Sequence, residues 1–325
     1  MPPLLFLAAA DVARCGLGPA ETTAAVREAF LALAAGRAAA APNLHLTPPG
    51  RKFSAKAAVL PEAVPGGPGL AVLKWYGSVP ANAARGLPEY RPMLLVNDAD
   101  TGLPLALLDG DWITTARAAA TSAVAAQALA RPEARRLGLV GCGRQGLAHL
   151  ETLAALWPLE QVTLHGRGAA GPRRAAARAE ALGLRAHIVD DARDAVAGQD
   201  IVVSAIGKPA EPTPGFLRAE WVDTGALAVM VDMGLAWVRE SLAGFDSIVS
   251  DELDPATRRS REALNYDGTL DADLASLLDR PILAGTPARQ RQAFVFAGAG
   301  LADAAVAAAV YRRAVQLGLG TRLVH

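Results

Sequence analysis

Cysteine, net charge and long apolar runs are all scarce in this sequence, and each absence argues against a class of protein. The two cysteines, Cys15 and Cys142, lie in a turn-like segment and in a glycine loop, where neither a disulfide nor a metal site is expected. Lysine plus arginine and aspartate plus glutamate balance at 32 each, so no nucleic-acid or anionic-membrane partner is predicted. No apolar run reaches the ~20 residues of a membrane-spanning helix. The N-terminus lacks the basic region and cleavage site of a signal peptide, which predicts a cytoplasmic protein.

What the sequence does contain is a glycine pattern near its centre. The apolar run 136–140 ends in Gly141-x-Gly143-x-x-Gly146, and apolar residues then recur at helical spacing. A second strand is expected at 161–165 and a third at 186–189, while the run 200–206 is typical of a buried parallel strand. Strand, glycine turn and helix thus follow one another as in a Rossmann fold, in which the helix N-terminus and the glycine backbone bind a pyrophosphate.

The end of the second expected strand indicates which cofactor is bound. An acidic residue there would hydrogen-bond the ribose 2′-hydroxyl of NAD, whereas an arginine accommodates the 2′-phosphate of NADP. This chain has His165-Gly166-Arg167-Gly168, followed by an arginine pair at 173–174. The pattern favours NADP(H), with Arg167 as the phosphate partner and NAD(H) as the alternative. A second interpretation is that these arginines only solvate a loop and the next helix.

The length of the chain, 325 residues, exceeds that of one ordinary core, so two domains are expected. A strand at 4–7, a helix from Pro19 to about Gly36 and short β segments between 54 and 108 precede the glycine pattern. Turns at 65–69 and 98–102 separate these segments, which predicts an antiparallel α+β domain. A helix after 297–300 is expected to pack against that domain and make it discontinuous. The predicted fold class is α/β, with residues 1–116 and 301–325 in the α+β domain and residues 117–300 in a Rossmann dinucleotide-binding domain.

Four charged residues stand where a charge needs an explanation. Lys74 lies at the end of an apolar strand, where an amine must find a partner, solvent or a ligand. Arg117 is expected near the start of a helix, where the macrodipole disfavours a cation and a bound anion would explain it. Asp232 follows the apolar strand 226–231, and Asp251 follows another, at strand ends that face the ligand crevice of an open α/β sheet. For Lys74 and Arg117 a structural salt bridge is the alternative.

A set of short motifs also runs from Lys74 to Tyr311 in a specific order. The motifs are Lys74 with Pro80-Ala81-Asn82, Asn97-Asp98-x-x-Thr101-Gly102-x-Pro104, Asp109-Gly110, Ile113-Thr114, Arg117-Ala118-Ala119, Gly141-x-Gly143-x-Gln145 with His149-Leu150, and Gly300-Leu301-x-Asp303 with Val310-Tyr311. Together they resemble the ornithine cyclodeaminase/μ-crystallin family. The residues from Lys74 to Ser78 look closer to the dehydrogenase-like branches of that family than to its cyclodeaminases.

The resemblance implies a homodimer built through the first domain, which also binds the substrate, and a nucleotide held by the second domain. It implies that Lys74 binds a substrate carboxylate, that Arg117 lines the cofactor and carboxylate site, and that Asp232 handles the amine proton. The expected catalytic residues are Asp232 and Lys74, the expected substrate-binding residues are Lys74, Arg117 and Ala299, and the expected cofactor-binding residues are Arg117, Gly141, Gly143, Arg144, Gln145, Gly146, Arg167, Ser204 and Gly298. No metal ligand is expected.

Three departures from the family pattern limit what the resemblance implies. The cyclodeaminases have an arginine after the proline near position 42, whereas this chain has Pro42-Asn43. They also continue from the aspartate with Pro-Gly-Lys, whereas Asp232 here leads into Met233-Gly234. The usual threonine after the arginine is replaced by Ala118. Because the first two changes affect groups expected to hold a diamino acid, they argue against ornithine as the substrate.

The sequence therefore predicts an NAD(P)(H)-dependent oxidoreductase that reduces a cyclic or N-substituted α-imino acid, or oxidises the corresponding amino acid. One alternative is a cyclodeaminase, a lyase that holds NAD tightly and releases ammonia on ring closure. It would need an acidic ribose partner and a second amine-binding group, and the sequence shows neither clearly. The other alternative is a crystallin-like protein that retains nucleotide without turnover, against which the joint presence of Lys74, Arg117 and Asp232 argues.

Overall fold

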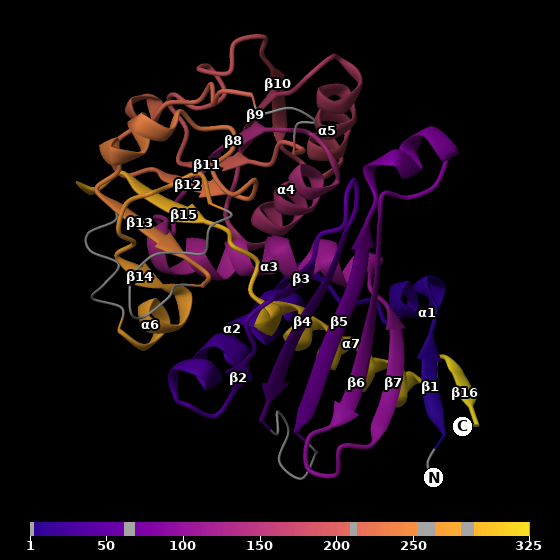
Figure 1. Cartoon of the computed structure of the whole chain (residues 1–325). Coiled ribbons are helices and arrows are strands. Elements are labelled where there is room, and N and C mark those ends of the chain that lie inside the picture. The colour runs from indigo at the N-terminus through magenta and orange to yellow at the C-terminus, as the bar shows by residue number, and fades with distance from the viewer. Residues whose placement is uncertain (1–2, 62–68, 209–212, 253–263, 281–288, 325) are drawn as a thin grey trace. The chain divides into compact units, whose positions relative to one another are not determined.

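The structure of the chain is a computed structural model that describes residues 3–61, 69–208, 213–252, 264–280 and 289–324. It divides into two compact units, one of residues Met1–Arg117 with Ala299–His325 and one of residues Ala118–Gly298 (Figure 1). The sequence predicted domain boundaries at 116/117 and 300/301, whereas the two units meet at 117/118 and 298/299. Of the predicted turn at 65–69, residues 65–68 lie outside the described residues.

The first unit carries a mixed sheet in the order β16-β1-β7-β6-β5-β4-β2, with β3 paired to β4. Its strands are β1 (Leu4–Leu7), β2 (Ala39–Ala40), β3 (Leu44–Leu46), β4 (Lys52–Leu60), β5 (Leu70–Ser78), β6 (Tyr90–Asp98), β7 (Pro104–Asp109) and β16 (Thr321–Leu323). Strands β4 to β7 are antiparallel, as predicted, but β1 and β7 pair in parallel, so the prediction of an antiparallel domain was wrong at this edge. No hairpin joins β1 to β7, so turn geometry does not impose their direction.

The turn between β6 and β7 shows how the sequence sets this register. Asp98 Oδ1 accepts hydrogen bonds from the backbone amide of Asp100 at 3.0 Å, and from the amide and hydroxyl of Thr101 at 2.8 and 2.9 Å. Gly102 follows with a φ of +73°, which favours glycine. The predicted turn at 98–102 is therefore confirmed, and it aligns β6 with β7.

Helices cover one face of the first sheet. The helices of this unit are α1 (Ala9–Arg14), α2 (Pro19–Ala34), the start of α3 (Asp111–Leu129) and α7 (Gly300–Leu317), with a short 3-10 helix at Pro80–Arg85. In Figure 1 the yellow α7 runs behind β4, β5 and β6, and it contacts all three. Along β4 the residues at even positions from Ser54 to Leu60 are buried, whereas those between them are half-buried or exposed. The sheet therefore has one face against α7 and an opposite outer face.

The second unit has a parallel sheet in the order β10-β9-β8-β11-β12-β15-β13-β14. Its strands are β8 (Arg136–Val140), β9 (Gln161–His165), β10 (Arg185–Ile188), β11 (Ile201–Ser204), β12 (Leu227–Met230), β13 (Ser247–Ser250), β14 (Ala272–Asp273) and β15 (Gln292–Val295). The first six strands in this order are β10, β9, β8, β11, β12 and β15. When they are numbered along the chain without β13 and β14, their order is 3-2-1-4-5-6, which is that of a doubly wound dinucleotide-binding sheet. The predicted Rossmann-type α/β fold is confirmed.

The helices of the second unit connect these strands. They are the remainder of α3, α4 (Arg144–Leu156), α5 (Ala170–Ala181) and α6 (Leu274–Asp279), with short 3-10 helices at Ala219–Trp221 and Arg239–Gly244. Every residue of β11, β12, β13 and β15 is buried, as expected for parallel strands covered on both faces. Among the described helices, none combines the length and the apolar character needed to cross a membrane.

Candidate active site and cofactor site

The glycine loop between β8 and α4 has room for a pyrophosphate. Gly141 has a φ of +99°, and a Cβ there would lie 2.5 Å from the carbonyl oxygen of Ala205. A Cβ on Gly146 would lie 2.1 Å from the carbonyl oxygen of Gly141, so larger residues are excluded at both positions. At Gly143, by contrast, nothing in the described residues lies within 4 Å of the Cβ position apart from the adjoining backbone of the loop and helix. The backbone is therefore open at the one glycine where a phosphate would approach.

The start of α4 offers polar groups to such a ligand. Gly143 is the N-cap of the helix and has no side chain to cap the first backbone amides. The side-chain oxygen Oε1 of Gln145 is buried and, among the described residues, has no hydrogen-bond partner. Arg144 is exposed beside it. Open backbone and uncapped amides fit the phosphates of a dinucleotide, which these residues would hold.

The loop after β9 exposes the arginine that the sequence analysis assigned to a 2′-phosphate. Arg167 is exposed and directly follows His165-Gly166 at the end of β9, where the chain has no acidic residue. Cys142 lies behind this loop, with its Sγ 3.5 Å from the carbonyl oxygen of His165. Burial raises the pKa of the Cys142 thiol to about 11, although the charge of Arg174 opposes the rise. The thiol therefore stays protonated near neutral pH and is not a nucleophile.

Asp232 follows β12 and its carboxyl group is buried, with 5% of the residue exposed. The hydroxyl of Ser204 lies 3.0 Å from Oδ1, and the amide of Ile206 donates to Oδ2 at 3.3 Å. Burial raises the pKa of Asp232 to about 6, against the effect of hydrogen bonds from Ile206, Ser204 and Gly234. A carboxyl group that titrates so near neutral pH can donate or accept a proton under physiological conditions.

The turn after Asp232 is held in an uncommon conformation. Met233 has a φ of +59°, which is rare for a residue with a side chain, and Gly234 follows at +79°. Asn265 stabilises this turn, because its side-chain amide donates to the carbonyl oxygens of Gly234 and Trp237, each at 3.0 Å. Such strain tends to cluster at functional sites, and here it fixes the backbone beside the titrating carboxyl group.

Lys74, Arg117 and Asp303 form a buried cluster within the first unit. Lys74 Nζ lies 2.8 Å from Asp303 Oδ1, and Arg117 Nε lies 3.1 Å from the same oxygen. Lys74 is fully buried, while Arg117 and Asp303 are 6% and 2% exposed. The structure thus shows the salt-bridge alternative for both cations. Arg117 also lies well inside α3, which begins at Asp111, so the prediction of a position near the helix start was wrong and the macrodipole does not explain its charge.

A third cation and two tyrosines lie around this cluster. Lys56 is directly opposite Lys74 in the register of β4 and β5 and is buried on the same face. Lys74 Nζ lies 5.4 and 5.7 Å from the ring centroids of Tyr76 and Tyr90. Burial lowers the pKa of Lys74 to about 7; the nearby carboxylate of Asp303 opposes this shift, and the other two cations add to it. The cluster therefore holds an amine that changes charge near neutral pH.

The charge of Asp303 balances only part of this positive charge. Burial opposes its ionisation, but Arg117, Lys74 and Lys56 outweigh that effect and lower the pKa of its carboxyl group. Sequence reasoning assigned Asp303 no function, although a carboxylate in the otherwise apolar first half of α7 was a signal for one. Three cations around one carboxylate are suited to bind an additional anion such as the carboxylate of an amino acid.

The remaining predicted residues lie where β15 leads into α7. Gly298 has a φ of +89°, and its amide donates to Asp251 Oδ2 at 2.9 Å. The amide of Ala297 donates to the same carboxylate at 2.5 Å. Asp251, which the sequence placed at a strand end with the same geometry as Asp232, thus holds the backbone of this segment. Ala299 is the N-cap of α7.

Comparison with known proteins gives one family for nearly the whole chain. The model of the ornithine cyclodeaminase/mu-crystallin family matches residues 5–317. The Δ1-pyrroline-2-carboxylate reductase of Bacillus cereus is 27% identical over 266 residues, which cover 77% of this chain and 79% of that enzyme. The alanine dehydrogenase of Archaeoglobus fulgidus is 29% identical over 205 residues, 63% of this chain and 60% of that enzyme.

Solved structures match over the full length of the fold. The Δ1-pyrroline-2-carboxylate reductase of Thermococcus litoralis, in complex with NADH and L-proline, superposes with a TM-score of 0.84 at 23% identity and covers 98% of this chain and 100% of its own. An archaeal alanine dehydrogenase dimer with bound NAD gives a TM-score of 0.82 at 24% identity, covering 99% of each chain.

Proposed function

Because the chain belongs to the ornithine cyclodeaminase/mu-crystallin family, we propose that it is an NAD(P)H-dependent oxidoreductase acting on the C–N bond of an α-imino or α-amino acid. The observation that carries this proposal is the buried carboxyl group of Asp232, at the end of a central strand of a dinucleotide-type sheet, with a pKa of about 6. The relatives named as pyrroline-carboxylate reductase and alanine dehydrogenase support it, since both names denote reactions at such a bond.

In the proposed reaction the protein supplies an anion site and a proton. Lys74 and Arg117 bind the carboxylate of the imino acid, and Asp303 holds both cations in place. A bound nicotinamide cofactor would supply a hydride to the α-carbon. Asp232 gives its proton to the imine nitrogen, so that the C=N bond becomes CH–NH and the carboxyl group becomes a carboxylate. With a pKa of about 6, roughly a tenth of Asp232 is protonated at pH 7, and water can restore the proton between turnovers.

For the cofactor we propose NADP(H) rather than NAD(H). The exposed Arg167 and the lack of an acidic residue at the end of β9 support this choice. Arg144, at the exposed start of α4, is proposed as a second contact to the phosphates. The two similar structures hold NADH and NAD. Our proposal shares the nicotinamide with them and differs from them in the preference for a cofactor with a 2′-phosphate.

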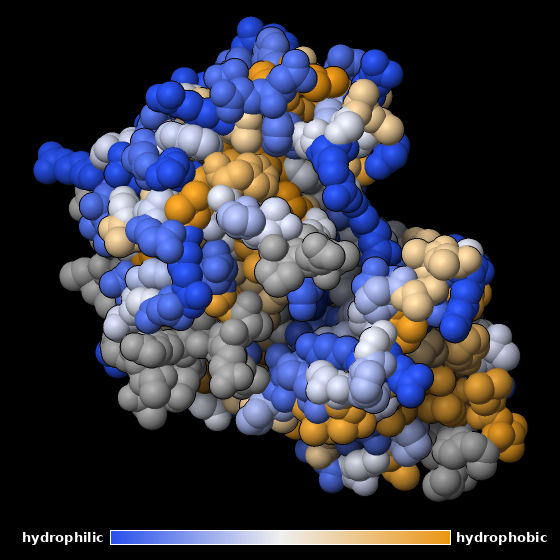
Figure 2. Space-filling view, turned by 45° about the horizontal axis from the view of Figure 1, so that its top comes forward, coloured by the Kyte–Doolittle hydropathy of each residue, from blue (hydrophilic) through white to orange (hydrophobic). Residues whose placement is uncertain are grey.

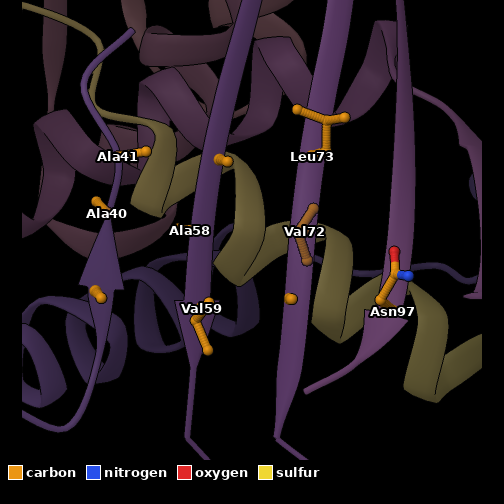
Figure 3. A pocket seen from close by; sticks show the side chains of 10 residues that line it. Ala40, Ala41, Ala58, Val59, Val72, Leu73 and Asn97 are labelled. Carbon is orange, nitrogen blue, oxygen red and sulfur yellow. The ribbon is translucent and has the colours of Figure 1, made fainter. Parts of the chain in front are cut away.

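We also propose that the chain forms a homodimer through the outer face of the first sheet. That face is apolar: Val59, Leu73 and Trp75 are exposed by 44%, 38% and 42%. Figure 2 shows hydrophobic residues gathered on the part of the surface that belongs to this unit. Alanines at 39–41, 57 and 71 leave a shallow pocket there, with Val59 and Leu73 at its sides and α7 behind the strands (Figure 3). A second copy would cover these side chains, which water otherwise contacts.

The compartment that we propose is the cytoplasm. Cys15 and Cys142 are both free and buried, which is compatible with a reducing compartment.

The decisive experiment mixes purified protein and NADPH with a panel of cyclic imines and of α-keto acids paired with amines, and follows NADPH absorbance. Steady oxidation with one member is the expected result and names the substrate class. Ammonia released from a diamino acid at catalytic NAD, without oxidation of NADPH, would instead identify a cyclodeaminase. Tight NADPH binding without turnover of any compound would identify a crystallin-like protein.

A further inference from the structure

We propose that Trp237 is a positioning residue that fixes the direction of a hydrogen-bond chain to Asp232 and thereby keeps the transferable proton on Oδ2. This inference rests on the proposed function, in which Asp232 donates that proton. Trp237 does not contact the carboxyl group itself and acts through Ser204. The relay is defined as Trp237, Ser204 and Asp232.

The relay is short and buried. Trp237 Nε1 lies 3.0 Å from Ser204 Oγ, and Ser204 Oγ lies 3.0 Å from Asp232 Oδ1. Trp237 and Ser204 are fully buried, and Asp232 is 5% exposed. The indole N–H can only donate a hydrogen bond, so Ser204 must accept it. The single proton of the Ser204 hydroxyl is then directed to Oδ1.

This direction decides which oxygen of Asp232 carries the proton. If the proton were on Oδ1, the carboxyl group and the indole would both donate to Ser204 Oγ. The hydroxyl proton of Ser204 would then lose its acceptor within a buried site, which is unfavourable. Oδ2 has no such constraint, because a proton on it leaves the hydrogen bonds from the indole to Ser204 and from Ser204 to Oδ1 in place. Oδ2 accepts a long hydrogen bond of 3.3 Å from the amide of Ile206, and the carboxyl group also accepts from the backbone amides of Gly234 and Asp232. Oδ2 is therefore the oxygen that receives and releases the proton.

Trp237 is held firmly enough to perform this role. Its carbonyl oxygen accepts from Asn265 at 3.0 Å, and its amide donates to the carbonyl oxygen of Gly234 at 3.0 Å. Its ring packs edge-on against Phe245, with centroids 5.5 Å apart. A Cβ on Gly215 would lie 2.0 Å from the Trp237 carbonyl oxygen, so glycine is required where the two backbones meet. The indole therefore keeps one orientation toward Ser204.

Among the described residues, the charged side chains on the neighbouring segments are exposed, except for Asp251 at the end of β13, whose buried carboxylate accepts hydrogen bonds from the amides of Ala297 and Gly298. Lys208 follows β11 and is exposed, and Arg239, which follows the strained turn, is exposed and ion-paired with the exposed Asp267. Water screens charges in such positions. Burial, opposed by the hydrogen bonds from Ile206 and Ser204, therefore governs the titration of Asp232, and a change in the relay should alter it.

The test is the pH dependence of kcat for NADPH-dependent imine reduction in the wild type, Trp237→Phe and Ser204→Ala. Protonated Asp232 is the active form, so kcat falls as the pH rises through its pKa. Loss of the indole N–H weakens the hydrogen bond that Ser204 gives to the carboxylate, and the fall should move to higher pH by about half a unit. Ser204→Ala should move it further, because it removes that hydrogen bond altogether. Trp157→Phe, at a buried tryptophan outside the relay, is the matched control and should keep the wild-type profile.

A fall in kcat by the same factor at every pH, with an unchanged midpoint, would reduce Trp237 to a packing residue and overturn the proposal. A second measurement needs no substrate: the emission of Trp237, taken as the difference between the wild type and Trp237→Phe, is followed from pH 4 to 9. It should change as Asp232 titrates, and the change should vanish in Asp232→Asn. Emission that does not change as Asp232 titrates would refute the relay even if the enzyme is active. If the emission follows the titration of Asp232 but the protein reduces no imine, only the proposed reaction is refuted.

Discussion

Lys74 and Asp303 form a fully buried ion pair, with Nζ and Oδ1 2.8 Å apart. The pair joins β5 to α7 across most of the sequence, and Arg117 meets the same oxygen from α3. One carboxylate on α7 thus fixes two cations, one on β5 and one on α3. In the low dielectric of a protein core, removing one member leaves the others uncompensated, so Asp303 should matter to both stability and ligand binding.

Asp303→Asn should lower the free energy of unfolding by about 3–5 kcal/mol, because it leaves Lys74 and Arg117 buried without their carboxylate. Denaturant unfolding of the variant and of Asp100→Asn, at an exposed loop carboxylate, measures the difference. The control should stay within about 0.5 kcal/mol of the wild type. Equal stability of the two variants would mean that Asp303 does not stabilise the cluster.

Lys74 should make stability depend on pH in a defined window. Burial lowers its pKa from 10.5 to about 7, so between these values the unfolded chain holds a proton that the folded chain has lost. The free energy of unfolding contributed by this group therefore rises with pH from about 7 to 10.5 and is lowest below 7. Lys74→Met should remove that rise, whereas Lys208→Met, at an exposed lysine, should retain it. Denaturant unfolding at pH 6.5, 8 and 9.5 measures the slopes, and parallel slopes in wild type and Lys74→Met would contradict the assignment.

The sequence predicted the parallel sheet well, because a strand, a glycine turn and an amphipathic helix are local patterns. Gly141 and Gly146 could be assigned from spacing alone, and the structure shows steric reasons for both. The parallel pairing of β1 with β7 could not be predicted, since the residues that separate them include most of the first sheet. Strand order within a sheet of distant segments depends on packing rather than on local composition.

The chemistry of the site was predicted only in part for the same reason. Lys74 and Asp232 stood out because each is a charge that follows an apolar run. The prediction that Lys74 ends its strand was wrong, because β5 continues to Ser78 and Lys74 lies at its middle. The partner of Lys74 is 229 residues away, and the partners of Asp232 are 26 and 28 residues before it, so no local pattern connects them. Trp237 gave no signal, because a tryptophan in an apolar segment is usually core.

Asp232→Asn should reduce kcat for imine reduction by about 10²- to 10⁴-fold, since the amide cannot donate a proton of comparable acidity. Binding of NADPH, measured by quenching of protein fluorescence, should change less than about twofold, because the substitution preserves shape and removes no group assigned to the cofactor. Full activity in the variant would show that another group protonates the nitrogen. Loss of NADPH binding would show that Asp232 organises the cofactor site instead.

Arg167→Ala should raise the KM for NADPH by about 10- to 100-fold, the effect of losing a hydrogen bond to a charged phosphate. The KM for NADH should stay unchanged, since that cofactor lacks the 2′-phosphate. Arg185→Ala removes an exposed arginine from β10 and serves as the control for lost surface charge. If Arg167→Ala affects both cofactors equally, the arginine contributes general electrostatic attraction and the preference for NADP is not explained by this residue.

Trp75→Glu should convert the protein to a monomer at micromolar concentration. Trp75 stacks on Phe53 with centroids 6.1 Å apart, and both lie on the outer face of the first sheet, where burial against a second copy would require the charge to be desolvated. The dimer dissociation constant should rise on the order of 30-fold or more, as expected for a central aromatic contact. Sedimentation across a concentration series measures it, and Leu182→Glu, at a similarly exposed leucine of the second unit, should leave it unchanged. A monomeric wild type would refute the proposed homodimer. A dimer that Trp75→Glu does not weaken would show that the interface lies elsewhere.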